Sequence, residues 1–255
     1  MLAKERRLYI LSRLNSQPTV RISDLCRELN VSRSTVQRDL AHLEKEGHII
    51  RERGGAVKVG IEEIISDLTE RPVLEKLNVN LEAKKSIASE AAKEIVDGDL
   101  VFMDAGTTAL QIIPYLYNKK IKIVTYSYLL VSKLNNSDID VYMLGGKYNQ
   151  KHEICYGATT INNLNEFRFD KAIITAIGVD LQLNEAYTSE VDVGGIKKVA
   201  MSRSQRNILL LDDSKFNVTG LCKFADLEDF DAIYVNSKPK KAKKLKNIIV
   251  TEGEK

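Results

Sequence analysis

The feature that most constrains the fold is a series of seven short apolar runs between residues 100 and 251. The runs read LVFMD, IKIVT, DVYML, KAIITAIG, NILLLD, AIYVN and NIIVT, and segments with helical periodicity lie between them. Runs that are apolar at nearly every position are typical of strands buried on both faces, and alternation with helices indicates parallel pairing. We therefore predict an α/β domain with a mainly parallel, doubly wound sheet that helices cover on both faces.

The first 58 residues follow a different pattern. Apolar residues at helical spacing predict a helix over about 3–15 and a shorter helix over 22–29. Ser32 is well placed to cap a third helix, which should stop at Gly47. This third helix is expected to bury Val36, Leu40 and Leu43.

Two extended runs around Gly54 and Gly55 follow the third helix and predict a hairpin wing. The order of elements predicts a small winged helix-turn-helix domain. The polar side chains near the start of the third helix suit base edges and phosphates. A three-helix dimerisation domain with a solvated polar face is the alternative. The predicted DNA contacts are Arg33, Ser34, Thr35, Gln37 and Arg38 of the helix and Arg51, Arg53, Gly54 and Gly55 of the wing.

Basic charge is concentrated in the same segment. The chain through Lys58 contains 12 Lys and Arg residues against 7 Asp and Glu residues, whereas the remainder contains 26 against 28. An excess of positive charge in a small N-terminal module is typical of nucleic-acid binding. We predict that residues 1–58 bind DNA, that residues 59–80 form a linker interrupted by Pro72, and that residues 81–255 form the second domain.

Small and polar residues follow several of the predicted strands. In open α/β sheets, ligands bind beyond the carboxyl ends of the strands. Glycine and threonine after the first strand can receive an anion at a helix N-terminus, although a simple turn uses the same residues. Their convergence on one edge of the sheet favours a small anionic ligand.

Other classes of protein receive less support. The three cysteines are far apart and show no metal-ligand or disulfide spacing, which fits a reducing compartment. No apolar run approaches the roughly 20 residues of a membrane span, and the N-terminus does not resemble a signal peptide, so we expect a cytoplasmic protein without membrane contact. The acidic residues and Lys215 show no recognisable catalytic signature. We expect no catalytic residues, no metal and no cofactor.

The N-terminal motifs closely resemble the DeoR family of bacterial transcription regulators. The resemblance rests on Val31-Ser32 in the turn, Arg38-Asp39-Leu40 in the recognition helix and Gly54-Gly55-Ala56 in the wing. The chain from about Lys76 onward resembles the sensor domain of that family, which is similar in fold to ribose-5-phosphate isomerase and binds phosphorylated sugars. The resemblance and the strand ends together imply effector contacts at Asp104, Gly106, Thr107, Thr108, Thr125, Ser127, Gly145, Gly146, Lys147, Gly178, Asp212 and Lys215.

Four positions depart from the family pattern. Gln37 stands where a second Arg is common, and Tyr126 replaces the usual Asn. Asn149 takes the place of a frequent Arg, and Val193 stands where a Glu is common. We expect the last three to lie near the effector and to alter which ligand is bound.

The combined interpretation is a transcriptional regulator of sugar metabolism. We expect a repressor that binds double-stranded operator DNA as a homodimer or homotetramer, because one recognition helix reads only a few base pairs. A phosphorylated sugar is expected to modulate operator binding. An activator of the same architecture is the first alternative, and a sugar-phosphate isomerase or hydrolase fused to a DNA-binding domain is a more distant one.

Overall fold

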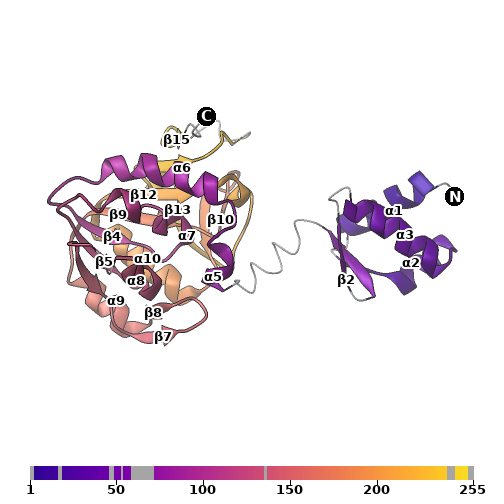
Figure 1. The fold of residues 1–255 in the computed structure, drawn as a ribbon, viewed down its shortest axis with the longest axis horizontal. Helices are drawn as coiled ribbons and strands as arrows, with labels where there is room; N and C mark the ends of the chain where they lie inside the picture. The colour runs from indigo at the N-terminus through magenta and orange to yellow at the C-terminus, as the bar shows by residue number, and fades with distance from the viewer. Residues whose placement is uncertain are drawn as a thin grey trace. The chain divides into compact units, whose positions relative to one another are not determined.

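The computed structural model describes residues 3–16, 19–45, 49–52, 54–58, 72–134, 137–239 and 245–251. The chain divides into two compact units, Met1–Thr69 and Glu70–Lys255. Figure 1 draws the elements of both units.

The described residues of the first unit form three helices and a three-stranded antiparallel sheet. The predicted helices are confirmed, and the strands of the wing pair as a hairpin. An additional short strand between the first two helices pairs with the wing and was not predicted. The elements are α1 (Ala3–Ser16), β1 (Thr19–Arg21), α2 (Ile22–Leu29), α3 (Arg33–Lys45), β2 (Ile49–Glu52) and β3 (Gly55–Lys58), with the strand order β1-β3-β2.

The core of this unit confirms the predicted apolar face of α3. Val36, Leu40 and Leu43 are buried together with residues of α1 and α2. The backbone N–H and the hydroxyl of Thr35 both contact the Ser32 hydroxyl, which confirms the predicted cap. The predicted stop at Gly47 lies outside the described residues.

The second unit is built on a seven-stranded sheet whose strands are the seven apolar runs. Every neighbouring pair in it is parallel, in the order β15-β14-β12-β9-β4-β5-β6. The strand order reverses between β4 and β9, which makes this seam the topological switch point. The strands are β4 (Leu100–Met103), β5 (Lys122–Thr125), β6 (Asp140–Met143), β9 (Phe169–Thr175), β12 (Ser204–Leu211), β14 (Ala232–Val235) and β15 (Ile248–Val250).

Helices cover the sheet on both faces, as predicted for a doubly wound fold (Figure 1). Alternate strand residues point to opposite cores: Val101 and Met103 join one cluster, whereas Phe102 joins the other. One face carries α5 (Val73–Lys76), α6 (Leu81–Ala91), η1 (Ala92–Glu94), α7 (Thr107–Leu110), η2 (Ile113–Tyr115) and α8 (Tyr128–Leu134); the other carries α9 (Ala158–Asn165) and α10 (Val191–Ser202).

The second unit also contains strands that were not predicted. The run KAIITAIG divides into β9 and a separate strand, β10, which starts at Gly178 and belongs to a small antiparallel sheet. The additional elements are β7 (Lys147–Asn149), β8 (Ile154–Tyr156), β10 (Gly178–Asp180), β11 (Glu185–Thr188), β13 (Cys222–Asp226), η3 (Asp213–Lys215) and η4 (Leu227–Asp229); β7 pairs with β8, and the small sheet has the order β10-β11-β13.

Two further details differ from the sequence interpretation. The apolar residues Ile87, Ala88, Ala91, Ala92, Ile95 and Val96 predict a helix that extends to Val96, but the helical turns end at Glu94 and Val96 is exposed. Val73, in the segment expected to be a linker, is buried in the core of the second unit beside α6.

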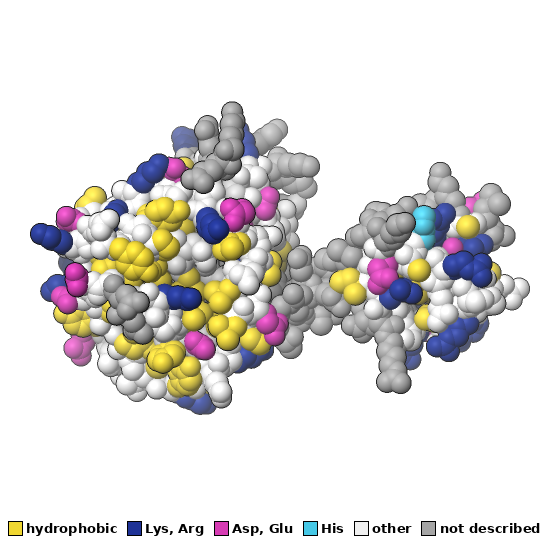
Figure 2. All heavy atoms as spheres, viewed as in Figure 1, with side chains coloured by type: hydrophobic (Ala, Val, Ile, Leu, Met, Phe, Trp, Pro, Cys, Tyr) yellow, Lys and Arg dark blue, Asp and Glu magenta, His cyan; other side chains and the backbone are white. Residues whose placement is uncertain are grey.

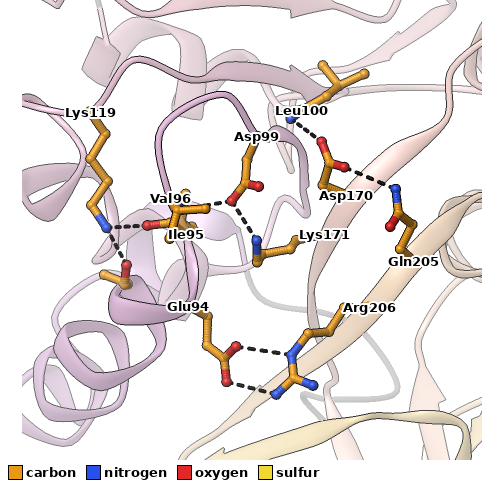
Figure 3. Close-up of polar contacts among 11 residues, drawn as sticks. Glu94, Ile95, Val96, Asp99, Leu100, Lys119, Asp170, Lys171, Gln205 and Arg206 are labelled. Carbon is orange, nitrogen blue, oxygen red and sulfur yellow. Dashed lines mark hydrogen bonds and ion pairs between the residues drawn. The ribbon is translucent and has the colours of Figure 1, made fainter.

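Ion pairs close the amino-terminal edge of the sheet (Figure 3). Glu94 accepts hydrogen bonds of 3.0 and 2.9 Å from the Arg206 guanidinium and one of 2.8 Å from the Tyr234 hydroxyl. The Lys171 ammonium lies 2.6 Å from the Asp99 carboxylate. Burial raises the pKa of Glu94, but Arg206 and Tyr234 outweigh it, so that the pKa is lowered. This edge is therefore charged and internally neutralised.

Candidate functional site

The N-terminal half of α3 presents a polar surface. Arg33, Gln37 and Arg38 are exposed, and no hydrogen bond or ion pair within the described residues engages them. Ser34 is also exposed, and Thr35 is half-buried beside the cap. These side chains are of the types that contact base edges and phosphates, and their contact with DNA stays a prediction.

Asp39, within the same motif, has a different role. Its carboxylate is buried and accepts hydrogen bonds of 2.7 and 3.3 Å from the Arg6 guanidinium. This pair ties α1 to α3, while the preceding Arg38 points away from the core. The Arg-Asp-Leu motif therefore combines one exposed contact residue with two residues that fix the helix.

The wing is shaped by its two glycines. Gly54 has φ of +100°, which favours glycine, and a Cβ on Gly55 would lie 2.2 Å from the Val20 carbonyl oxygen of β1. Arg51 is exposed and pairs with Glu44 of α3 at 2.7 Å. An exposed pair of this kind contributes little to stability, so the guanidinium can exchange Glu44 for a phosphate. Arg53 lies outside the described residues.

In the second unit, Asp104 lies at the switch point between β4 and β9. Its buried carboxylate accepts hydrogen bonds from the Thr175 backbone N–H at 2.9 Å, from the Thr175 hydroxyl and from the Tyr126 hydroxyl at 2.5 Å. The Lys197 ammonium, from α10, forms an ion pair with the same carboxylate. These donors join three adjacent strand ends and one helix.

The electrostatics of this group indicate a stable internal ion pair. Burial raises the pKa of Asp104, but the Lys197 ammonium and the hydroxyl donors outweigh it, and the pKa is lowered. Lys197 is itself buried and also donates to the Thr175 carbonyl at 3.1 Å. Asp104 is fully enclosed, and its carboxylate links the ends of β4, β5 and β9 to α10.

Gly106 is required by close packing. A Cβ at this position would lie 2.1 Å from the Thr175 hydroxyl oxygen, so only glycine lets the loop after β4 approach β9. The helix that follows, α7, has only four residues. The dipole of this helix is therefore small, because the macrodipole is the sum over aligned peptide units. It can contribute little to the anion binding expected at Gly106, Thr107 and Thr108.

Thr107 and Thr108 are buried residues whose hydroxyl groups could contact a ligand. Both residues are more than nine-tenths buried. Among the described residues, no hydrogen bond reaches either hydroxyl group. Each hydroxyl therefore has both a donor and acceptor sites to offer at the end of β4.

The other predicted effector residues divide between internal packing and distant loops. The hydroxyls of Thr125 and Ser127 are buried and bonded to neighbouring backbone groups. Gly145 and Gly146 pack against α9, where the Thr160 hydroxyl donates to the Gly145 carbonyl at 2.8 Å. Two residues complete the set: Lys147, which is exposed and lies 5.5 Å from the Tyr156 ring centroid, and Gly178, whose Cβ would lie 2.3 Å from the Val218 carbonyl oxygen.

A second charged cluster surrounds Asp212 at the end of β12. Asp212 is buried and accepts hydrogen bonds from the Asn80 amide at 2.9 Å and from the Ser214 hydroxyl at 2.5 Å. Lys84 of α6 is buried nearby, and its ammonium donates to the Lys76 carbonyl at 2.7 Å. Lys215 is half-buried beside it. One carboxylate thus faces several ammonium groups.

This imbalance affects the protonation of Lys84. Burial lowers the pKa of Lys84 to about 8, and the positive charges of Lys215 and Lys76 add to the effect against the opposing attraction of Asp212. An ammonium carries three donors, and the described residues provide one acceptor for it. The cluster can therefore accept an additional anion.

Two of these residues, Lys84 and Lys197, were not singled out from the sequence. Lys84 precedes Ile87, Ala88 and Ala91 at helical spacing, and Lys197 lies one residue after Ile196 and three before Ala200. Both lysines occupy positions in the apolar stripe of their helix. A charged residue on such a stripe must be paired or functional, and this signal could have identified both.

The family departures also have local structural roles. The Tyr126 hydroxyl donates to Asp104, whereas Val193 of α10 is buried in the core. The Asn149 side chain accepts from the backbone N–H of Lys151 at 3.0 Å and shapes the turn after β7. Val193 therefore does not lie exposed at the strand ends.

The described residues lack two kinds of feature. No group of three or more His, Cys, Asp or Glu side chains among them is arranged to hold a metal ion. None of their helices has the length and apolar character needed to cross a membrane.

Solved structures similar to this chain share a part of its length. Ribose 5-phosphate isomerase A from Methanocaldococcus jannaschii matches with a TM-score of 0.39 at 19% identity, over 52% of this chain and 53% of that chain. The translation initiation factor eIF-2B from Pyrococcus horikoshii OT3 matches with a TM-score of 0.43 at 18% identity, over 63% and 64% of the two chains.

The relatives in sequence cover nearly the whole chain. The HTH-type transcriptional repressor GlcR of Bacillus subtilis is 32% identical over 95% of this chain and 92% of its own length. The lactose phosphotransferase system repressor of Lactococcus lactis subsp. lactis is 33% identical over 84% of both chains. Residues 6–60 match the DeoR-like helix-turn-helix domain, and residues 79–237 match the DeoR C terminal sensor domain. The chain therefore belongs to the DeoR family and is a DNA-binding transcriptional regulator.

Proposed function

We propose that this regulator represses genes of sugar metabolism and that a phosphorylated sugar modulates its binding to operator DNA. The names of its relatives support this assignment, because they include repressors of a lactose phosphotransferase system and of an aga operon. The observation that carries the effector half is the excess of positive charge at buried Lys84 and half-buried Lys215.

DNA binding is assigned to α3 and the wing. Arg33, Gln37 and Arg38 would enter the major groove, and Arg51 would contact a phosphate beside it. Because one recognition helix reads only a few base pairs, two copies bound to adjacent half-sites would supply the specificity. The working form is therefore a homodimer or a homotetramer.

The effector is assigned to the carboxyl edge of the sheet. The ammonium groups of Lys84 and Lys215 would bind the phosphate, and the hydroxyls of Thr107 and Thr108 would bind the phosphate or the sugar. The role is regulatory and not enzymatic, since Asp104 is engaged by Lys197 and so is a poor general base. Binding would favour one arrangement of the sensor units and thereby change operator affinity.

A salt titration of operator binding tests the proposed DNA interface. Arg38→Ala should weaken binding and reduce the slope of log K against log salt by about 0.9 for each phosphate that the variant no longer neutralises. Arg27→Ala, which removes an exposed arginine of α2, is the matched control and should bind as the wild type does. An unchanged affinity and slope for Arg38→Ala would exclude this residue from the interface. Footprinting on the promoter then separates repression from activation by the position of the operator.

A thermal-shift panel of sugar phosphates and their unphosphorylated parents tests the effector. A ligand at one hundred times its dissociation constant adds about 2.7 kcal/mol to the free energy of unfolding. Thr107→Val should reduce this shift in melting temperature and leave operator binding intact. Thr159→Val, at an exposed threonine of α9, is the matched control and should change neither the shift nor operator binding. A panel without any phosphate-dependent shift would contradict the proposed effector.

A further inference from the structure

β6 is an edge strand, and no other strand of the described residues pairs with its outer side. It has one neighbour in the seven-stranded sheet, β5, so that alternate backbone N–H and C=O groups point away from the sheet. Natural proteins blunt such edges with lysine, proline or a bulge. β6 reads DVYM and pairs with β5 in continuous register, so it carries no lysine, proline or bulge, and its protection is limited to its length of four residues and to exposed Asp140 at its start.

The side chains of this strand are about as exposed as those of β15 at the other edge of the sheet, where Ile249 is 39% and Val250 is 44% exposed. Tyr142 is 44% exposed and Met143 is 37% exposed, whereas all four residues of β14 in the same sheet are buried. Tyr142 rests on Phe167 of the α9 side, with ring centroids 5.7 Å apart. Val141 packs toward the α8 side. Apolar side chains are therefore present on both faces of this edge, although Asp140 shares the face of Tyr142.

Aromatic side chains extend this surface beyond the carboxyl end of the strand. Tyr148 of β7 and Tyr128 of α8 are both exposed and meet edge to face, with ring centroids 6.3 Å apart. Hydrophobic side chains gather on the face of the second unit turned toward the viewer in Figure 2, including the region of α8 and the β7–β8 hairpin. Exposed tyrosine is enriched in protein–protein interfaces, because it combines apolar area with a polar hydroxyl.

The charges at the two ends of β6 differ in sign. Asp138 and Asp140 are exposed at its beginning, and Lys147 is exposed after its end. A two-fold axis perpendicular to a sheet places two copies of an edge strand antiparallel, so that the acidic end of each meets the basic end of the other. A second copy of this chain therefore matches the strand in both charge and hydrogen-bonding direction.

We propose that two copies of this chain associate through β6, in antiparallel pairing that joins the two seven-stranded sheets into one. Tyr142 lies in the middle of the interface, and Tyr128 and Tyr148 extend over the beginning of the partner strand. This inference rests on the dimer of the proposed function and names its interface. The experiments distinguish a dimer that uses another surface from a chain that does not dimerise.

Sedimentation velocity of the full chain is the first measurement, with two variants matched at opposite edges of the sheet. Tyr142→Asp places two carboxylates at the centre of the interface and should raise the dimer dissociation constant at least about 100-fold, as expected for loss of an interface hot spot. Ile249→Asp changes an exposed residue of β15 and should leave it unchanged. Melting temperatures confirm that both variants are folded.

Cysteine cross-linking supplies an independent measurement. Tyr142→Cys should form a disulfide-linked dimer under mild oxidation well above the background of the wild-type chain, which contains three cysteines of its own. Ile249→Cys should remain at that background. A wild-type dimer that survives Tyr142→Asp, or a Tyr142→Cys variant without excess cross-linking, would show that the chain dimerises elsewhere. A wild-type chain that is monomeric at tens of micromolar, alone and on DNA, would overturn both this surface and the dimeric mode of binding.

Discussion

The two edges of the parallel sheet handle buried charge differently. At the amino edge, Glu94 pairs with Arg206 and Asp99 pairs with Lys171, so each carboxylate has its own cation. At the carboxyl edge, Asp104 is matched by Lys197, whereas Asp212 accepts hydrogen bonds from Asn80 and Ser214, and buried Lys84 donates to a backbone carbonyl. Neutralised pairs hold strands and helices together. An unneutralised buried cation is costly unless a ligand supplies the missing charge.

The largest expected effect comes from breaking the matched pair at the carboxyl edge. Asp104→Asn leaves Lys197 buried without its counter-charge, and loss of one partner of a buried pair costs about 3–5 kcal/mol of unfolding free energy. Urea denaturation of the variant measures this loss. A change below about 1 kcal/mol would show that Lys197 reaches water or another anion, and the distinction between the two edges would then fail.

The unmatched cation should behave in the opposite way. Lys84→Met keeps the length of the side chain and removes a charge that burial disfavours, so the ligand-free protein should be as stable as the wild type or more stable. The stabilisation by a sugar phosphate, about 2.7 kcal/mol at one hundred times its dissociation constant, should be lost. Lys85→Met, at the exposed neighbouring lysine, is the matched control and should retain the ligand response.

The pH dependence of stability and of phosphate affinity tests the role of Lys84 separately. The pKa of Lys84 is about 8 in the folded protein against an ordinary value of 10.5, so the unfolded chain holds this proton more tightly. Between these values stability gains a contribution that increases with pH, and the contribution should be absent in Lys84→Met. Phosphate affinity should fall as pH rises past about 8, because the ammonium is lost. Lys84→Arg keeps its charge and should flatten the affinity profile; the same decline in Lys84→Arg would assign it to another group.

The smallest effect is expected at the amino edge. Glu94→Gln breaks the pair with Arg206, whose side chain is 40% exposed and can be hydrated in place of the carboxylate. Partly exposed pairs contribute at most about 1 kcal/mol, and the effect should shrink as salt is added. Denaturation at two ionic strengths checks both statements. A loss of unfolding free energy as large as that of Asp104→Asn would show that the ion pairs at the two edges contribute equally to stability.

Much of the fold was predictable because it depends on periodic burial. The seven apolar runs became the seven parallel strands, and the stripes of α1 to α3 gave the winged helix-turn-helix. The small sheet of β10, β11 and β13 was missed because its short strands contain polar and charged residues, such as Asp180 and Glu185, that interrupt an apolar run.

The site was only partly predictable for a related reason. Threonine and glycine after β4 were identified by position, but the sequence does not show that the Gly106 backbone meets Thr175 across the seam. The helix expected after Gly106 is a single turn, and Pro114 lies in the first turn of the following short helix. Lys84 was overlooked because a lysine is normally solvated, although its place among Ile87 and Ala88 indicated burial.

The seam between β4 and β9 also has a consequence for folding. Asp104 and Thr175 are 71 residues apart, and the sheet strands between them lie entirely on the β5 and β6 side. During synthesis, the first half of the sheet must therefore wait for β9 before it can be extended, and contacts of such long range slow folding. The residues proposed to bind the effector at the end of β4 acquire their final setting only when this junction closes. A sugar phosphate that binds there would then act as a check on completed assembly as well as a metabolic signal.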